Sequence, residues 1–138
     1  TNILVYANLA QSPFHSQAVS RLQELENQES ELCASRQVLR EYLAVMTRPD
    51  ILTREIPIAS LVRDVLGFED SMFILDDGPE VTAKLLKTVE QYLVAGKQIH
   101  DANIVATMCV HDIPTLLTHN TVDFKRYQDI ITTMPLEG

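Results

Sequence analysis

Glycine and cysteine are scarce in this chain, which holds four glycines and two cysteines in 138 residues. The few glycines argue against a phosphate-cradling loop, and neither a GxGxxG nor a P-loop sequence is present. Cys33 and Cys109 lie in apolar runs without a CxxC spacing, which predicts buried, reduced thiols and a cytoplasmic protein. The four histidines are scattered, so their spacing does not indicate a zinc site.

Long hydrophobic runs are also missing. No apolar stretch approaches the roughly 20 residues that span a bilayer, and no signal-peptide pattern opens the sequence. We therefore expect no membrane partner.

Positive charge is in deficit, since 11 Lys and Arg stand against 19 Asp and Glu, for a net charge of −8. This balance argues against a general nucleic-acid coat, because contacts to phosphates need Lys and Arg. An acidic protein still acts on nucleic acid where its carboxylates gather on divalent cations, which reverse the local sign of the charge.

Short apolar runs alternate with amphipathic segments along the whole chain. This alternation predicts an α/β fold over residues 1–138, a single domain with a mostly parallel sheet between two helical layers. The expected strands lie within 2–7, 31–35, 72–76, 113–118 and 129–134, and the expected helices lie within 14–25, 36–48, 57–67, 79–96 and 101–112, with a short helical turn at 123–127.

Several boundary residues refine this pattern. Ser35 is a plausible N-cap for the helix that follows it, and Pro57 and Pro79 suit the first turns of two later helices. We expect Gly67 and Gly96 to stop the helices that they follow.

Ligands of such sheets gather at the carboxyl ends of the strands, so the acidic residues there are candidates. Glu41 shares one helical stripe with Val38 and Val45, where it serves either as a ligand or as a boundary residue paired with Arg40 or Arg48.

Other polar residues at these ends also have two interpretations. Asp101 suits an N-cap as well as a ligand, and so does Asp123, while Asn120 suits an Asx-turn. Asp77 reads as part of a turn with Gly78.

In their order, these blocks resemble the PIN-domain ribonucleases over nearly the whole chain. The resemblance is carried by "TNILVYA" at the start, Glu41 in "SRQVLREYLAVM", Asp101 in "IHDANIVATM" and the block "LLTHNTVDF". The compact size is similar to that of the toxins of VapBC-type toxin–antitoxin pairs. The family's first Asp would stand directly before Thr1, and Asn120 occupies a position that is often Asp.

The resemblance implies a hydrolase that uses Mg²⁺ or Mn²⁺ to cut RNA. Its metal ligands would be Glu41, Asp101 and Asp123, with Asn120 contributing its amide oxygen. Thr118 and Asn2 would orient these ligands, and the cations at the rim that would hold phosphates are Arg36, Arg40, Lys125 and Arg126.

The resemblance also implies partners: an antitoxin protein that covers the acidic site, and a second copy of the chain, with Phe14 and Ile58 as contact candidates. A PIN-like binding module without a working metal site remains the alternative. A haloacid-type phosphatase is disfavoured because no DxDx[TV] sequence follows the first apolar run. A receiver domain is disfavoured because this chain shows neither paired acids near the end of that run nor the expected lysine late in the sequence.

Overall fold

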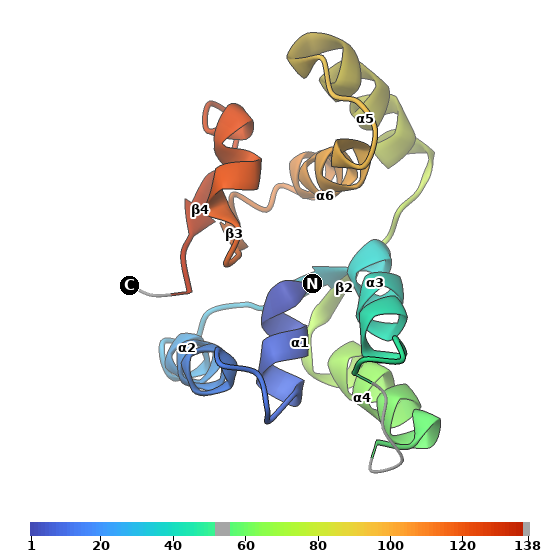
Figure 1. Cartoon of the computed structure of the whole chain (residues 1–138). Helices are drawn as coiled ribbons and strands as arrows, with labels where there is room; N and C mark the ends of the chain where they lie inside the picture. The colour runs from blue at the N-terminus through green and yellow to red at the C-terminus, as the bar shows by residue number, and fades with distance from the viewer. Residues whose placement is uncertain (52–55, 137–138) are drawn as a thin grey trace. The chain divides into compact units, whose positions relative to one another are not determined.

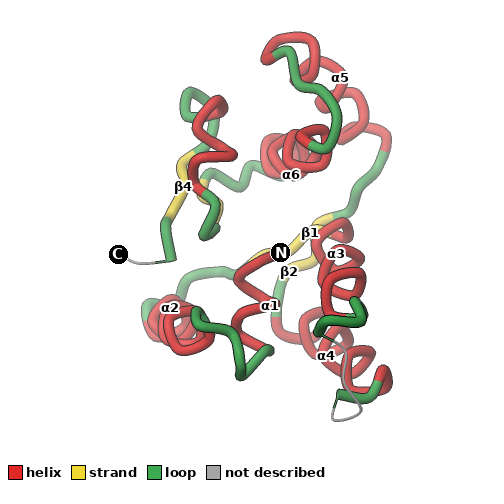
Figure 2. The backbone as a smooth tube through the Cα atoms, in the orientation of Figure 1, coloured by secondary structure: helices red, strands yellow, loops and turns green. Residues whose placement is uncertain are grey.

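The computed structural model describes residues 1–51 and 56–136 of the chain. It confirms an α/β architecture in which short strands alternate with pairs of helices (Figures 1 and 2). The elements in chain order are α1 (Asn2–Asn8), α2 (His15–Asn27), β1 (Cys33–Ser35), α3 (Arg36–Met46), α4 (Ile58–Ser71), β2 (Phe73–Leu75), α5 (Pro79–Tyr92), α6 (Gln98–Val110), β3 (Thr115–Leu117), the 3₁₀ helix η1 (Thr121–Tyr127) and β4 (Thr132–Met134).

The chain forms two compact units, Thr1–Ile74 and Leu75–Gly138, each described here by itself. The described residues form two small sheets, in which β1 pairs with β2 and β3 pairs with β4. The β3–β4 pair is parallel, with Leu116 opposite Thr133, as expected for strands joined by a helical crossover. No helix in the described part of the chain is long and apolar enough to cross a bilayer.

The first unit is built around an apolar core to which α1, α3 and α4 contribute. Its buried residues are Val5, Leu9, Tyr42, Met46 and Leu61. Tyr42 and Met46, one turn apart on α3, are 0% and 1% exposed, so this stripe of α3 anchors the unit.

The segment 2–7 is helical, and the predicted first strand is therefore wrong. A short, continuous apolar run suits a buried helix as well as a buried strand, because periodicity alone does not separate them. Here Val5 and Leu9 lie one helical turn apart and both enter the core, which favours the helix.

The boundary predicted for α3 is confirmed. The Ser35 hydroxyl accepts a hydrogen bond from the Val38 N–H at 3.2 Å, which satisfies one of the donors left open at the start of a helix. The predicted stop at Gly67 is wrong, because α4 continues to Ser71. A glycine inside a helix costs about 1 kcal/mol, and Phe68 packs against the core directly after it, which offsets that cost.

The second unit is dominated by α5 and α6, which lie side by side (Figure 1). Pro79 begins α5 as predicted, but α5 ends at Tyr92, with Leu93 in the left-handed conformation (φ 52°), and not at Gly96. Val81, Ala102 and Val105 are fully buried, and η1 adds Phe124 and Tyr127 to this core. The rings of Tyr92 and Tyr127 meet edge-on with their centroids 5.1 Å apart.

The Tyr42 hydroxyl donates a hydrogen bond of 2.7 Å to the carboxylate of Asp64 on α4. Burial and this bond raise the pKa of the Tyr42 phenol. Because hydrogen bonds to charged groups contribute about 1.5–3 kcal/mol, we expect Tyr42→Phe to destabilise the protein by that amount in urea denaturation.

A double-mutant cycle with Asp64→Asn isolates this bond from other effects of the two substitutions. We expect the two effects to be strongly non-additive. Additivity within about 0.5 kcal/mol would contradict a direct Tyr42–Asp64 bond.

Candidate active site

Glu41 lies on α3, and both of its carboxylate oxygens accept a hydrogen bond from an uncharged group. The Thr1 hydroxyl donates to Oε1 at 2.5 Å, and the Gln37 side-chain amide donates to Oε2 at 2.9 Å. Gln37 is itself buried, and Glu41 is half-buried. The two donors fix the direction of the carboxylate without neutralising its charge.

The predicted alternative for Glu41, an ion pair with Arg40 or Arg48, is wrong for this structure. The cation of α3 with an ion pair is Arg36, whose guanidinium lies 2.9 Å from the Glu69 carboxylate of α4. Both side chains of that pair are over a third exposed, so solvent screens it and it contributes little to stability. Arg40 is exposed on the same helix.

The contact between Thr1 and Glu41 also places the start of α1 beside this carboxylate. Thr1 is the N-cap residue of α1, and Asn2, the predicted orienting residue, is its first helical residue and half-buried.

Asp101 is half-buried in the first turn of α6. The predicted N-cap role is wrong, because α6 begins earlier, at Gln98, and its N-cap residue is Lys97. A carboxylate in a first turn is nevertheless favoured by the helix dipole. Burial raises the pKa of the Tyr127 phenol, and the charge of Asp101 raises it further while Arg126 lowers it. Asp101 thus lies within electrostatic reach of η1.

The segment between β3 and η1 carries the other predicted ligands. The buried Thr118 hydroxyl accepts a hydrogen bond from the Asn120 N–H at 3.1 Å and so holds the turn into η1. The N-cap residue of η1 is Asn120 and not, as predicted, Asp123, which lies in the first turn. Both side chains are exposed.

The predicted phosphate contacts of the second unit lie on η1. Lys125 and Arg126 are both exposed and belong to its last turn. The Arg126 guanidinium donates to the Gln98 side chain at 3.1 Å, which ties η1 to the first residue of α6, in the same turn as Asp101.

The donor atoms of Glu41, Asp101, Asp123 and Asn120 are all oxygens, which suits a hard cation such as Mg²⁺ in kind. Within residues 1–51 and 56–136, the structure does not bring three or more His, Cys, Asp or Glu side chains into a group able to hold a metal ion. Glu41 belongs to the first unit and the other three belong to the second. Their assembly into one ligand set stays a prediction.

The family comparison decides the class of protein. The family model described as "PIN domain" matches residues 1–130, nearly the entire chain. The chain belongs to the PIN domain family. PIN domains are in general nuclease domains that need divalent metal ions. No curated protein matches this chain closely enough to count as a relative.

The sequence suggested the candidate acids, which stay a prediction, but the groups that orient Glu41 were not predicted. Gln37 stands four residues before Glu41, a spacing that places both on one helix face, so it was readable from the sequence. Thr1 lies 40 residues from Glu41 in the sequence, so no local sequence pattern predicts the hydrogen bond between them.

The electrostatic effect of Asp101 on Tyr127 is directly testable. We expect Asp101→Asn to lower the pKa of the Tyr127 phenol, because the substitution removes a negative charge that disfavours the phenolate. The pKa stays above its ordinary value, since burial is the larger cause and persists.

The measurement is an NMR titration of tyrosine ring carbons in labelled protein, with Tyr127→Phe to assign the signal. Asp123→Asn is the matched control and should leave this pKa unchanged. An Asp101→Asn variant with the wild-type Tyr127 titration would show that Asp101 does not face η1.

Proposed function

We propose that this PIN domain is a metal-dependent endoribonuclease that hydrolyses RNA phosphodiester bonds with Mg²⁺ or Mn²⁺. The observation that carries the proposal is the Glu41 carboxylate, which is held by the neutral donors Thr1 and Gln37. A half-buried carboxylate is costly without a compensating cation, so this arrangement favours a metal ligand over a structural ion pair.

In this proposal Glu41, Asp101 and Asp123 hold the metal, and Asn120 adds its amide oxygen. Thr118 and Asn2 orient these groups, a role that the bond between Thr118 and the Asn120 N–H supports. When bound, the metal lowers the pKa of a water molecule and stabilises charge on the leaving oxygen. The expected products carry 5′-phosphate and 3′-hydroxyl ends.

RNA has to approach a protein whose net charge is −8. Exposed cations near the candidate ligands would hold the phosphates, namely Arg40 on α3 and Lys125 and Arg126 on η1. Arg36 would have to leave its ion pair with Glu69 for this role, so we assign it a smaller share.

The family resemblance supports finer assignments that we also propose. The fold would be one domain over residues 1–138, a three-layer α-β-α sandwich with a mostly parallel central sheet, to which the parallel β3–β4 pair is suited. The protein would be a cytoplasmic toxin neutralised by an antitoxin protein.

Homodimerisation is a further proposal, and an apolar stripe on α4 supports it. Ile58, Val62 and Leu66 lie one turn apart and are 59%, 48% and 59% exposed. Phe14, the other predicted contact, is half-buried, and its ring packs against Tyr6 with a centroid distance of 5.0 Å.

The second candidate function is a PIN-like binding module for RNA or protein that lacks a working metal site. The observation that favours it is Asn120, which brings no charge to a position that is often acidic in the family. Metal dependence separates the two candidates.

Cleavage of a mixed RNA pool tests the proposed activity. We expect divalent-dependent cleavage that excess EDTA abolishes, and a loss of at least about 100-fold in Asp101→Asn and Glu41→Gln, since even groups that only support a metal ligand contribute 10- to 100-fold. Asp70→Asn, a change of an exposed carboxylate on α4, is the matched control. Activity in EDTA, or unimpaired activity in both site variants, would contradict the mechanism.

Thermal unfolding with Mn²⁺ tests the metal site without relying on activity. Metal at 100 times its Kd should stabilise the folded protein by about 2.7 kcal/mol, because it binds the folded state preferentially. Glu41→Gln and Asp101→Asn should both lose this gain. A wild-type protein that Mn²⁺ does not stabilise would instead support the binding module.

A further inference from the structure

Asp77 is the only aspartate of the chain that a glycine follows. The Asp77–Gly78 sequence lies between β2 and α5, within residues 76–78, which belong to neither a helix nor a strand. Asp77 is exposed, and Gly78 is the N-cap residue of α5. These residues all belong to the unit Leu75–Gly138, so the site lies within one unit.

The backbone at Gly78 leaves its nitrogen available for a reaction with the Asp77 side chain. In the described part of the chain, the Gly78 N–H donates no hydrogen bond to another backbone group. Gly78 adopts φ −96° and ψ −170°, an extended conformation that any residue adopts, so the backbone itself does not require glycine here. The glycine has a chemical consequence instead, because no Cβ atom shields its nitrogen from the neighbouring carboxyl group.

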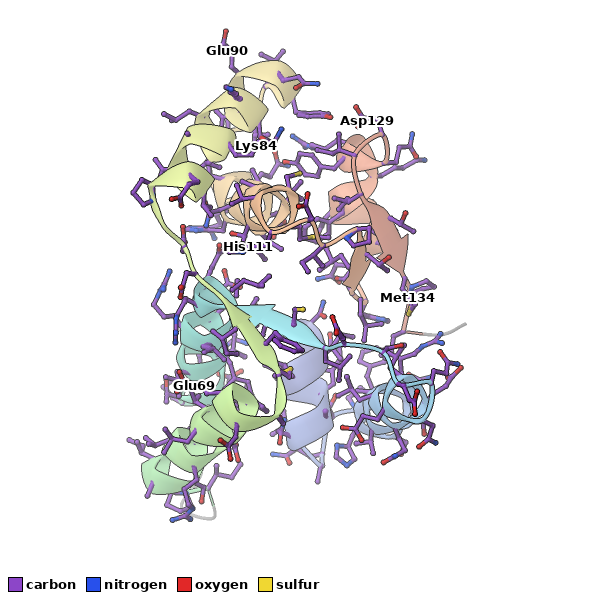
Figure 3. The ribbon with its side chains drawn as sticks, turned by 180° about the vertical axis from the view of Figure 1, so that it is seen from behind. Glu69, Lys84, Glu90, His111, Asp129 and Met134 are labelled. Carbon is purple, nitrogen blue, oxygen red and sulfur yellow. The ribbon has the colours of Figure 1, made fainter. Side chains whose placement is uncertain are left out.

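Two hydrogen bonds from α6 hold this segment. The Asn103 side-chain amide donates to the Asp77 carboxylate at 3.0 Å. The His111 ring nitrogen Nε2 lies 2.9 Å from the Asp76 carbonyl oxygen, and Nε2 is the donor, because a carbonyl only accepts hydrogen bonds. Figure 3 shows His111 at the end of α6, beside the chain that leads into α5. Ring closure between Asp77 and Gly78 requires the carboxyl group to turn its carbon toward the Gly78 nitrogen, and the bond from Asn103 opposes that rotation.

We propose that Asp77–Gly78 is a site of spontaneous isoaspartate formation, and that Asn103 limits the rate by holding the Asp77 carboxylate against α6. This inference goes beyond the proposed function and does not depend on it. Two observations carry it: the exposed, irregular backbone at an Asp-Gly sequence, and the side-chain bond from the neighbouring helix.

The reaction needs only the protein and water. The Gly78 nitrogen attacks the carboxyl carbon of protonated Asp77, a carbon–nitrogen bond forms, and the proton of that nitrogen leaves with the carboxyl hydroxyl as water. Water then opens the resulting cyclic succinimide at either carbonyl. Opening at the side-chain carbonyl restores aspartate, and opening at the backbone carbonyl gives isoaspartate, in which the chain continues through the former side chain.

The modification inserts a methylene into the main chain directly before α5. The Gly78 carbonyl accepts hydrogen bonds from the Val81 N–H at 3.0 Å and the Thr82 N–H at 3.3 Å, which close the first turn of that helix. Val81 is fully buried in the core of the unit. We therefore expect isoaspartate at position 77 to loosen the first turn of α5 and to break the bond to Asn103.

Ageing of the full chain at neutral pH, without metal or RNA, tests the site. Enzymatic methylation of isoaspartate, followed by peptide mapping, should locate the modification at Asp77. Asp70 is the internal control: it is also exposed and precedes a small residue, Ser71, but it lies inside α4 and should stay unmodified. A full chain that stays unmodified at Asp77 while a synthetic peptide of residues 74–80 converts would overturn the proposal.

The role of Asn103 is tested by removing its amide. Asn103→Ala should raise the rate of isoaspartate formation about 2- to 10-fold, the factor that corresponds to a hydrogen bond of ordinary net strength. Asn103→Leu, which is nearly isosteric, is the second releasing variant and should do the same if Asn103→Ala proves too unstable to compare. Asn8→Ala, which removes an amide that donates to the Leu4 carbonyl instead, is the matched control. Wild-type rates in both Asn103 variants would overturn the protective role.

Gly78→Ala tests the chemistry from the other side of the bond. An added Cβ would lie 2.9 Å from the Glu80 carboxylate oxygen, which is the far end of a flexible side chain and can move. The variant should fold and should form isoaspartate more slowly, because the methyl group shields the nitrogen. An unchanged rate in Gly78→Ala would contradict ring closure at this position.

Amide hydrogen exchange shows what the modification does to the fold. The Val81 and Thr82 amides should exchange faster in the purified isoaspartate form than in unaged protein. Equal exchange in the two forms would overturn the proposed loosening of α5.

Discussion

The proposed chemistry depends on a half-buried carboxylate whose charge is oriented and not neutralised. Glu41 accepts hydrogen bonds from the Thr1 hydroxyl and the Gln37 amide, and both donors are uncharged. On the same helix, Arg36 neutralises the Glu69 carboxylate of α4 at the exposed surface. The two carboxylates therefore differ in their partners, since Glu69 pairs with a cation and Glu41 with two neutral donors. The proposed metal role of Glu41 depends on this difference.

The other requirement is that rigid elements carry the remaining acids. Asp101 belongs to the first turn of α6, a helix with a fully buried apolar side that includes Ala102 and Val105. The bond from Arg126 to Gln98 ties η1 to that turn. Thr118 holds the Asn120 backbone at the end of β3. Each candidate acid therefore stands on an element whose position is set by packing or by a hydrogen bond.

The sequence was most informative where local chemistry decides the structure. The Ser35 cap, the start of α5 at Pro79 and the existence of α6 were all predicted, because caps and proline act within one turn. The sequence-based predictions were wrong where tertiary packing determines the structure. Residues 2–7 form a helix because Val5 and Leu9 reach the core. Gly67 does not end α4, because Phe68 directly after it packs against the same core. The family resemblance supplied the candidate acids, which stay a prediction, whereas the Thr1–Glu41 contact joins residues too far apart in sequence for any local pattern to indicate it.

The most direct test of the central claim is paramagnetic broadening of backbone amide signals by Mn²⁺ in the full chain. If Glu41 and Asp101 hold the same ion, the amides around Glu41 in α3 and those around Asp101 in α6 will broaden in parallel, with one midpoint concentration. Broadening around only one of the two residues, or around neither, would contradict a shared metal site.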